Sequence, residues 1–379
     1  MNKLIPVCEP FLNGNELKYV SDAVSSGWIS SGGKYVTAFE EMFAAYCDCK
    51  YGVAVCNGTV ALHLALVALG IGKGDEVIIP TFTMVASAFA VCYTGATPVF
   101  VDANPQTWNI DIYKIEKKIT HKTKAIMPVH IFGQMCEMDA IELLAKKYNL
   151  FIIEDAAEAH GAEYKQKKAG SFSDIASFSF FANKNITTGE GGMVVTNNEN
   201  LYQKAKYYKN ICFPLDGNRN YTHNDMGFNY RMSNVLAAIG LAQTEKADKY
   251  KLLRVINNQT YRKYLATIPG IRMQYILPEC LSVSWMNGIV IEHEYGRTRD
   301  QLIAFLKENG VDTRLFFNGM HNQPSLLSHG CDCSGKYPVS DYLSQHGFYL
   351  PSGSNLTEET IQYICNLIDK FSPNKNKYE

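Results

Sequence analysis

One lysine lies between a strand-like segment and a group of glycines. Residues 177–192 read Ser177-Phe-Ser-Phe-Phe-Ala-Asn-Lys184-Asn-Ile-Thr-Thr-Gly-Glu-Gly-Gly192. Partial burial lowers the pKa of a lysine amine, and such an amine can form a Schiff base with an aldehyde cofactor. Ser179 precedes the lysine and is a candidate to hydrogen-bond a phosphate group. By its spacing alone, the stretch favours a surface lysine in a hairpin loop, so other segments must decide.

A second apolar segment ends in carboxylates. It reads Phe151-Ile-Ile-Glu-Asp155-Ala-Ala-Glu158-Ala-His-Gly161. Pyridoxal phosphate (PLP) acts as an electron sink when its pyridine nitrogen is protonated, and an aspartate such as Asp155 is the usual partner of that nitrogen. Glu158 follows one helical turn later and is placed to lie against the ring of such a cofactor. An aspartate in this position is equally typical of a helix N-cap.

A third segment predicts a strand, a tight turn and the start of a helix. It reads Cys56-Asn57-Gly58-Thr59-Val60-Ala61-Leu62. Free backbone N–H groups at a helix N-terminus bind phosphate well. The segment lacks the lysine of a Walker loop. A capped turn without a ligand is an equally good interpretation of these residues alone.

These segments lie within a regular alternation of apolar strand patterns and amphipathic helix patterns. This alternation predicts an α/β fold with a mostly parallel sheet covered on both faces, and ligands bind such sheets outside the carboxyl ends of the strands. The seven expected strands are residues 51–55, 76–80, 98–102, 124–130, 150–155, 174–180 and 193–196. The expected helices between them are residues 60–69, 85–93, 112–118 and 138–148.

The pattern changes after Asn229. A long helix is expected from residue 233 to about residue 265, followed by a strand at 284–291 and helices at 299–309 and 358–370. We therefore expect a large domain over residues 1–245, including an N-terminal segment, and a smaller C-terminal α+β domain over residues 246–379.

Composition excludes several classes of function. The formal charge of −1 and the absence of like-charge runs argue against a nucleic-acid surface. No stretch approaches the ~20 apolar residues that span a bilayer, and residues 1–10 do not resemble a signal peptide. Eleven scattered cysteines predict reduced thiols and a cytoplasmic location. Two Cys-Asp-Cys triplets, at 47–49 and 331–333, lack the usual zinc spacing, so no metal is expected.

Seven segments in the same order resemble the DegT/DnrJ-type family of PLP-dependent nucleotide-sugar aminotransferases. The resemblance covers nearly the whole chain, through residues 28–34, 57–59, 80–86, 130–134, 154–158, 177–192 and 227–232. It implies a fold like that of aspartate aminotransferase (type I PLP), in a homodimer with active sites at the interface. The cofactor then cycles between PLP and pyridoxamine phosphate.

The resemblance also implies roles for single residues. Lys184 corresponds to the Schiff-base lysine and Asp155 to the partner of the pyridine nitrogen, and these two are the expected catalytic residues. Glu158 and Met84 fall beside the cofactor ring, where relatives usually carry an aromatic residue in place of Met84. Phosphate contacts are expected from Gly58, Thr59, Ser179 and, in the partner subunit's site, Asn229. Arg231 either contacts substrate or forms a buried salt bridge.

Within the family, four stretches resemble the branch that forms GDP-perosamine: residues 9–16, 125–130, 178–181 and 240–243. This branch takes GDP-4-keto-6-deoxymannose and L-glutamate and releases 2-oxoglutarate. Candidates for the sugar-nucleotide pocket are Trp28, Arg314 and His321. Core packing is the alternative for Trp28.

Three departures from the family pattern leave other substrates open. They are Met84, Asn318-Gly319 and the segment 331–335. Alternatives are a UDP- or dTDP-linked keto sugar, or amination at carbon-3. A PLP-dependent sugar dehydratase of this family would carry histidine at position 184. A non-enzymatic regulator is disfavoured by the intact lysine, aspartate and phosphate set, and a dehydrogenase by the lack of a glycine fingerprint.

Overall fold

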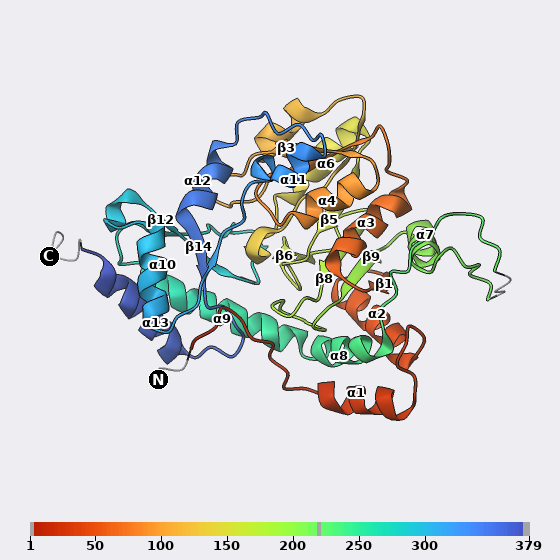
Figure 1. Ribbon diagram of the computed structural model, residues 1–379, viewed down its shortest axis with the longest axis horizontal. Coiled ribbons are helices and arrows are strands. Elements are labelled where there is room, and N and C mark those ends of the chain that lie inside the picture. The colour runs from red at the N-terminus through yellow and green to blue at the C-terminus, as the bar shows by residue number, and fades with distance from the viewer. Residues whose placement is uncertain (1–3, 218–220, 374–379) are drawn as a thin grey trace.

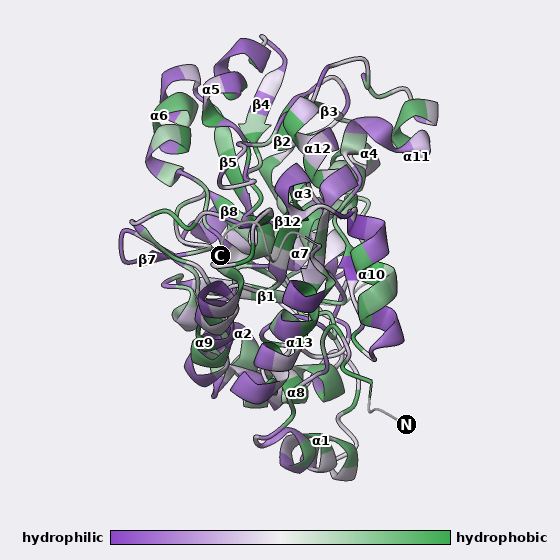
Figure 2. Ribbon diagram, turned by 90° about the vertical axis from the view of Figure 1, so that its left-hand side faces the viewer, coloured by the Kyte–Doolittle hydropathy of each residue, from purple (hydrophilic) through white to green (hydrophobic). Residues whose placement is uncertain are grey.

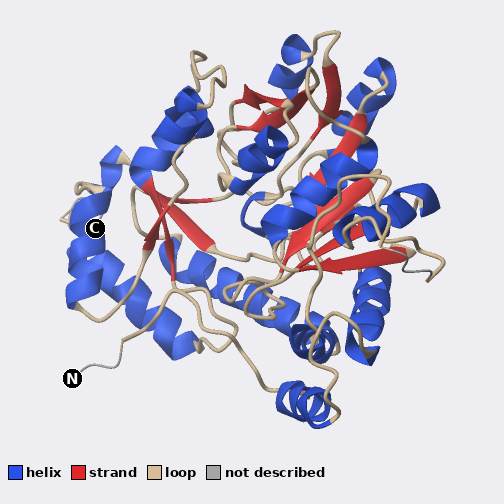
Figure 3. Ribbon diagram, turned by 45° about the vertical axis from the view of Figure 1, so that its right-hand side comes forward, coloured by secondary structure: helices blue, strands red, loops and turns tan. Residues whose placement is uncertain are grey.

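The computed structural model describes residues 4–217 and 221–373. A large sheet with helices on both faces lies beside a smaller unit of helices and short strands (Figure 1; Figure 3). The seven expected strands all belong to the large sheet, so the mostly parallel α/β fold is confirmed.

The large sheet has the strand order β1-β9-β8-β5-β4-β2-β3. Neighbouring strands run parallel, except that β9 is antiparallel to both β1 and β8. The strand expected at 124–130 ends at Ile126, because Pro128 has no N–H to donate to the ladder. Val129 then pairs with Asp155 in the same register as an isolated bridge. The strands are β1 (Tyr51–Val55), β2 (Glu76–Pro80), β3 (Thr97–Val101), β4 (Thr123–Ile126), β5 (Phe151–Asp155), β8 (Ile175–Ser179) and β9 (Gly192–Thr196).

Helices bury both faces of this sheet. Successive side chains of a strand point to opposite faces, so Ile152 of β5 belongs to one hydrophobic core and Ile153 to the other. The first core contains residues of α2 (Lys34–Tyr46), α6 (Met138–Tyr148) and α8 (Asn234–Thr244). The second contains residues of α3 (Gly58–Leu69), α4 (Ala86–Tyr93) and α7 (Glu199–Lys209). Two-sided burial explains why the strands read as continuous apolar runs (Figure 2).

The smaller unit is built on an antiparallel sheet of order β10-β12-β14-β13. Its strands are β10 (Ile271–Met273), β12 (Asn287–Ile291), β13 (Arg314–Leu315) and β14 (Gly347–Leu350). The expected strand 284–291 begins later, at Asn287. Its helices are α9 (Ala247–Leu265), α10 (Arg299–Glu308), α12 (Pro338–His346) and α13 (Glu358–Phe371), whereas α11 (Pro324–Ser328) packs against the second core of the large sheet through Leu326. Further α-helices and strands are α1 (Glu16–Ser25), α5 (Ile112–Ile115), β6 (Glu163–Tyr164), β7 (Lys167–Lys168) and β11 (Cys280–Leu281).

The single long helix expected from residue 233 is wrong. The chain forms two helices, α8 and α9, with a break at Glu245 and Lys246. The side chain of Glu245 accepts hydrogen bonds from Asn15 and Tyr19, at 2.7 and 2.6 Å. α8 packs on α1 and α2, whereas α9 packs on α13, so two different packing surfaces require two helix axes. The break coincides with the expected domain boundary at residue 245, and the division itself stays a prediction.

The cysteines are free thiols. Those of the two Cys-Asp-Cys triplets pack in or against the two cores, and the sulfur of Cys331 lies 3.6 Å from that of Cys92 on α4. Within residues 4–217 and 221–373, no group of three metal-ligating side chains comes together. Over the same residues, no helix combines the length and apolar character needed to cross a membrane.

Candidate active site

A cavity of about 590 Å³ opens at the carboxyl ends of the large-sheet strands. Parallel strands end at a common edge, so residues that follow them in sequence meet there. β5 ends at Asp155 and β8 at Ser179, while α3 begins at Gly58 shortly after β1. The cavity is lined by seven of the predicted site residues: Gly58, Thr59, Met84, Asp155, Glu158, Ser179 and Lys184.

The start of α3 and the end of β8 form one wall of this cavity. The side chain of Asn57 caps the helix by accepting a hydrogen bond from the N–H of Val60, at 3.0 Å. A Cβ atom at Gly58 would lie 2.6 Å from Cβ of Ser179, so a larger residue would collide with the serine. The first N–H groups of a helix have no helical partner. Together with the Ser179 hydroxyl, they form a cradle suited to a phosphate group.

Asp155 is buried at the base of the cavity. Its carboxylate accepts hydrogen bonds from the Ser87 hydroxyl at 2.7 Å and from the N–H of Ala157 at 3.2 Å. Burial raises the pKa of Asp155 above its ordinary value, although these hydrogen bonds and the charge of Lys184 oppose the increase. A protonated nitrogen placed against this carboxylate would favour the ionised form. Asp155 therefore fits the partner of a pyridine nitrogen.

Lys184 lines the same cavity from the turn after β8. Burial lowers the pKa of its amine, while the negative charges of Glu158 and Asp155 act in the opposite direction. A lowered pKa increases the fraction of neutral amine, which is the nucleophilic form. These three features of the cavity fit PLP: the cradle suits its phosphate, the Asp155 carboxylate suits its ring nitrogen and the Lys184 amine suits its aldehyde.

Glu158 is a buried residue whose carboxyl group lines the same cavity. Its Oε2 accepts a hydrogen bond from the backbone N–H of Phe132 at 2.7 Å. Burial raises the pKa of Glu158 to about 7, with the charge of Lys184 opposing the increase. Glu158 therefore tends to carry a proton in the folded protein at acidic and near-neutral pH.

Replacing Glu158 with glutamine is expected to reduce the pH dependence of stability in the cofactor-free protein. The unfolded chain ionises this carboxyl near pH 4.5, whereas the folded protein retains the proton up to about pH 7. A group whose pKa is raised on folding loses stabilising effect as the pH rises through that window. Thermal midpoints measured across the window should fall less in Glu158→Gln than in the parent chain. The exposed Glu308→Gln variant serves as the control, and equal slopes for all three proteins would contradict this assignment.

Other predicted residues lie outside the cavity. Trp28 is 63% exposed, and its carbonyl accepts a hydrogen bond from the Asn234 side chain at 2.6 Å. Asn229 is exposed and accepts a hydrogen bond from Nε of Arg231 at 2.8 Å. The described residues contain no ion pair between Arg231 and a carboxylate, so the buried salt bridge is not seen among them. The roles of all three residues stay predictions.

Arg314 and His321 also lie away from the cavity lining. Arg314 is largely exposed and forms an ion pair with Asp312 at 2.7 Å. Both ring nitrogens of His321 are engaged, Nδ1 with the Thr81 hydroxyl at 2.8 Å and Nε2 with Asp341 at 2.9 Å. His321 thus ties the loop after β2 to α12. Contact of either residue with a sugar nucleotide stays a prediction.

The structure adds lining residues that sequence patterns missed. Trp285, Phe317 and Tyr349 reach the cavity from the smaller unit, more than a hundred residues beyond β8. Their positions in the sequence carry no local signal, because they reach the cavity only through tertiary packing. Asn183 and Glu190 also line the cavity. Both lie close to Lys184 in the sequence, within residues 177–192, and that closeness is the signal that could have identified them as lining residues.

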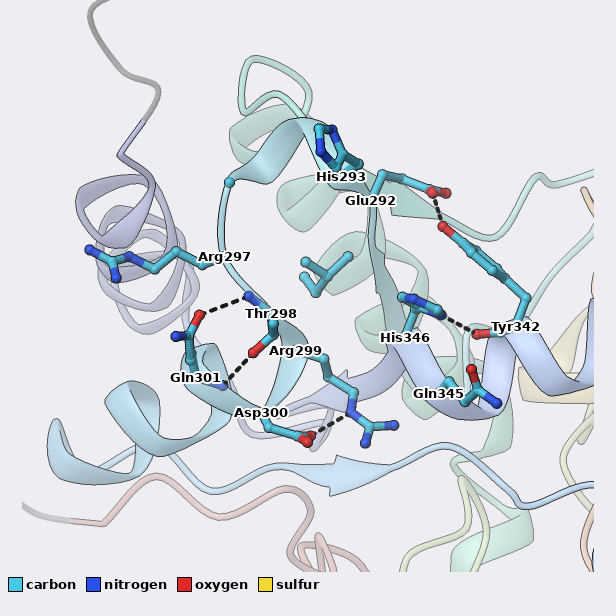
Figure 4. Close-up of a pocket in the computed structure, with 12 residues that line it drawn as sticks. Glu292, His293, Arg297, Thr298, Arg299, Asp300, Gln301, Tyr342, Gln345 and His346 are labelled. Carbon is cyan, nitrogen blue, oxygen red and sulfur yellow. Dashed lines mark hydrogen bonds and ion pairs between the residues drawn. The ribbon is translucent and has the colours of Figure 1, made fainter.

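A second cavity, of about 640 Å³, lies in the smaller unit between α10, β12 and α12 (Figure 4). Its polar side chains are largely paired with one another. Tyr342 donates a hydrogen bond to Glu292, and Arg299 forms an ion pair with Asp300. None of the predicted site residues lines it. The cavity at the sheet edge is therefore the candidate active site.

Comparisons with known proteins agree with this geometry. The DegT/DnrJ/EryC1/StrS aminotransferase family model matches residues 10–369. The GDP-perosamine synthase of Escherichia coli O157:H7 is 44% identical, over 98% of this chain and 100% of that protein. The GDP-perosamine synthase of Caulobacter vibrioides is also 44% identical, over 97% and 98%. The solved PMP form of Spr1654 from Streptococcus pneumoniae matches with a TM-score of 0.90 at 26% identity, over 97% and 98%.

The family model spans nearly the whole chain, and the two relatives cover 98% and 97% of it. Fold, cavity chemistry and sequence similarity therefore agree. The chain belongs to the DegT/DnrJ/EryC1/StrS aminotransferase family, a family of PLP-dependent nucleotide-sugar aminotransferases.

Proposed function

We propose that this protein transfers the amino group of L-glutamate to the carbon-4 ketone of GDP-4-keto-6-deoxymannose, forming GDP-perosamine and 2-oxoglutarate. The observation that carries the proposal is the 44% identity, over nearly full length, to two proteins named GDP-perosamine synthase. Lys184 supports transamination over dehydration, since a lysine both releases a bound amine and moves its protons. We expect the reaction to take place in the cytoplasm.

The residues of the cavity divide this chemistry between them. When bound, PLP supplies an aldehyde that takes up an amino group and a ring that accepts electrons. Nζ of Lys184 holds the cofactor and, once freed, takes the proton from the α-carbon of glutamate. Asp155 keeps a proton on the pyridine nitrogen. For the keto sugar, the same amine of Lys184 moves protons in the reverse direction.

We propose that the protein forms a homodimer with shared active sites, to which predicted residues outside the cavity contribute. Asn229, on the exposed surface, is proposed to reach the phosphate cradle of the partner subunit. Arg231 lies beside it and orients its side chain through the 2.8 Å hydrogen bond. We propose that Trp28, Arg314 and His321 contribute to the sugar-nucleotide pocket, either directly or by fixing neighbouring segments.

One observation keeps a second substrate class open. Met84 lines the cavity and is 51% exposed. A flexible thioether fills space differently from an aromatic ring, so the surface offered to a sugar differs from that of relatives with an aromatic residue. A dTDP- or UDP-linked keto sugar, aminated at carbon-3 or carbon-4, is therefore the alternative substrate.

A product assay tests the choice between these substrates. The PLP-loaded enzyme and L-glutamate are incubated separately with GDP-4-keto-6-deoxymannose and with the dTDP and UDP 4-keto-6-deoxyglucose compounds. The amino sugars are then identified by mass spectrometry. We expect kcat/KM for the GDP sugar to exceed the other two by roughly 10²-fold or more. Preference for a dTDP or UDP sugar would refute the GDP assignment, and turnover without glutamate would indicate a dehydratase.

A further inference from the structure

Trp285 connects the smaller unit to the turn that carries Lys184. Its side chain is almost completely buried, and its indole Nε1–H donates a hydrogen bond to the carbonyl of Asn183 at 2.8 Å. Its backbone is fixed on both sides. The N–H of Trp285 donates to the carbonyl of Phe132 at 2.9 Å, and its carbonyl accepts from Nη1 of Arg254 at 3.0 Å. The indole is therefore held in one orientation by the surrounding fold.

The face of this indole lies directly beneath the Lys184 side chain. Nζ of Lys184 is 3.7 Å from the centroid of the Trp285 ring. The face of an aromatic ring carries negative charge density, and tryptophan provides the strongest such attraction for a cation. The attraction is larger where the pair is desolvated, and the Trp285 ring is buried. The charged form of Lys184 thus has a defined resting position inside the cavity.

A chain of contacts links this position to Glu158. The N–H of Phe132 donates to the carboxylate of Glu158, and the carbonyl of Phe132 accepts from the N–H of Trp285. Residue 132 adopts a left-handed backbone conformation, with φ of 55°, which places its N–H and carbonyl in these two bonds. The acidic group and the ring that face Lys184 are therefore positioned by the same loop residue.

We propose that Trp285 is a positioning residue that holds the freed amine of Lys184 on its ring face while the lysine moves protons. The proposal rests on the proposed role of Lys184. A lysine side chain has four rotatable bonds. A fixed binding position on the ring face therefore confines its ammonium group to a short path between the α-carbon of glutamate and the cofactor. The indole N–H of Trp285 also fixes the backbone next to Lys184, because it donates a hydrogen bond to the carbonyl of Asn183. Other titratable groups that interact with Lys184 are Asp155, Glu158, His160 and Cys8.

The pyridoxamine-phosphate form of the holoenzyme leaves the Lys184 amine free and so allows a direct test. Competitive acylation across neutral to alkaline pH, read by peptide mass spectrometry, gives the pKa of Lys184. We expect Trp285→Leu to lower this pKa by about one unit, because the cation loses its ring partner. The variant should also lower kcat about tenfold with little change in KM for glutamate, since positioning affects the chemical step. Trp285→Phe, which keeps a weaker ring and loses the N–H donor, should show intermediate effects.

Trp108→Phe is the matched control. Trp108 is also buried, its indole nitrogen has no hydrogen-bond partner among the described residues, and it does not line the cavity. An unchanged Lys184 pKa in both Trp285 variants would overturn the proposal, as would an equal decrease in Trp108→Phe. Borohydride reduction of the PLP-loaded enzyme identifies the lysine that carries the cofactor. A tag on another lysine would refute the role of Lys184. If the tag is on Lys184 but the pKa of Lys184 in Trp285→Leu equals that in the parent enzyme, only the role of Trp285 is refuted.

Discussion

Replacement of Lys184 by alanine is expected to lower the rate of amino transfer by roughly 10³-fold or more, since the variant loses both the covalent attachment of the cofactor and the group that moves protons. Lys184 is the lysine that lines the candidate cavity, facing Asp155 and Glu158. The substitution removes a partly buried amine without adding bulk, so the fold should persist. Single-turnover measurement with glutamate, followed by absorbance, tests the first half of the reaction.

The exposed Lys73→Ala variant provides the matched control and should keep the parent rate. Borohydride reduction should fix the cofactor to the parent chain and to Lys73→Ala but not to Lys184→Ala. Retained turnover of the keto sugar by Lys184→Ala would remove this lysine from the mechanism.

Replacement of Asp155 by asparagine is expected to lower kcat by roughly 10²- to 10³-fold, the usual cost of removing one preorganised electrostatic partner. The amide keeps the size of the side chain and still accepts a hydrogen bond from Ser87. It lacks the negative charge that keeps a proton on the pyridine nitrogen. Reduction with borohydride should still fix the cofactor to Lys184, which separates this variant from one that cannot bind PLP.

Two further variants place the Asp155 result in context. Ser87→Ala removes the hydroxyl that donates to the carboxylate at 2.7 Å, and it should cost roughly 10- to 10²-fold, the scale of one hydrogen bond to a charged group. Asp248→Asn changes an exposed aspartate on α9 and should leave the rate unchanged. A parent-like rate in Asp155→Asn would show that this carboxylate does not support the ring nitrogen.

Much of the fold was predictable because its signals are local. Each strand of the large sheet is a short apolar run, and the helices between them carry their own periodicity. Differences at the ends have local causes, as at Pro128, which interrupts the ladder between β4 and the Val129–Asp155 bridge. The break between α8 and α9 was missed because the residues around it favour helix. Contacts of Glu245 with Asn15 and Tyr19, over two hundred residues away, accompany the change of axis.

The residues of the candidate site likewise fall into two groups, those with a local sequence signal and those brought in by tertiary packing. Gly58, Asp155, Ser179 and Lys184 were candidates because each lies at or shortly after a strand end or at a helix start, positions that the topology of a parallel sheet brings together. The resemblance to the family then supplied their proposed roles. Trp285, Phe317 and Tyr349 were not found. Their approach depends on how the smaller unit packs against the sheet, which no periodicity within a few residues can encode.

The sequence by itself determined the α/β architecture and placed the candidate cradle, carboxylate and amine at one edge of the sheet, because strand and helix geometry act over a few residues; their proposed roles came from the resemblance to the family. Only the tertiary structure decided that an indole from the smaller unit lies under Lys184 and that His321 bonds Thr81 and Asp341. These contacts join segments far apart in sequence, and their geometry is set by the packing of whole layers against one another.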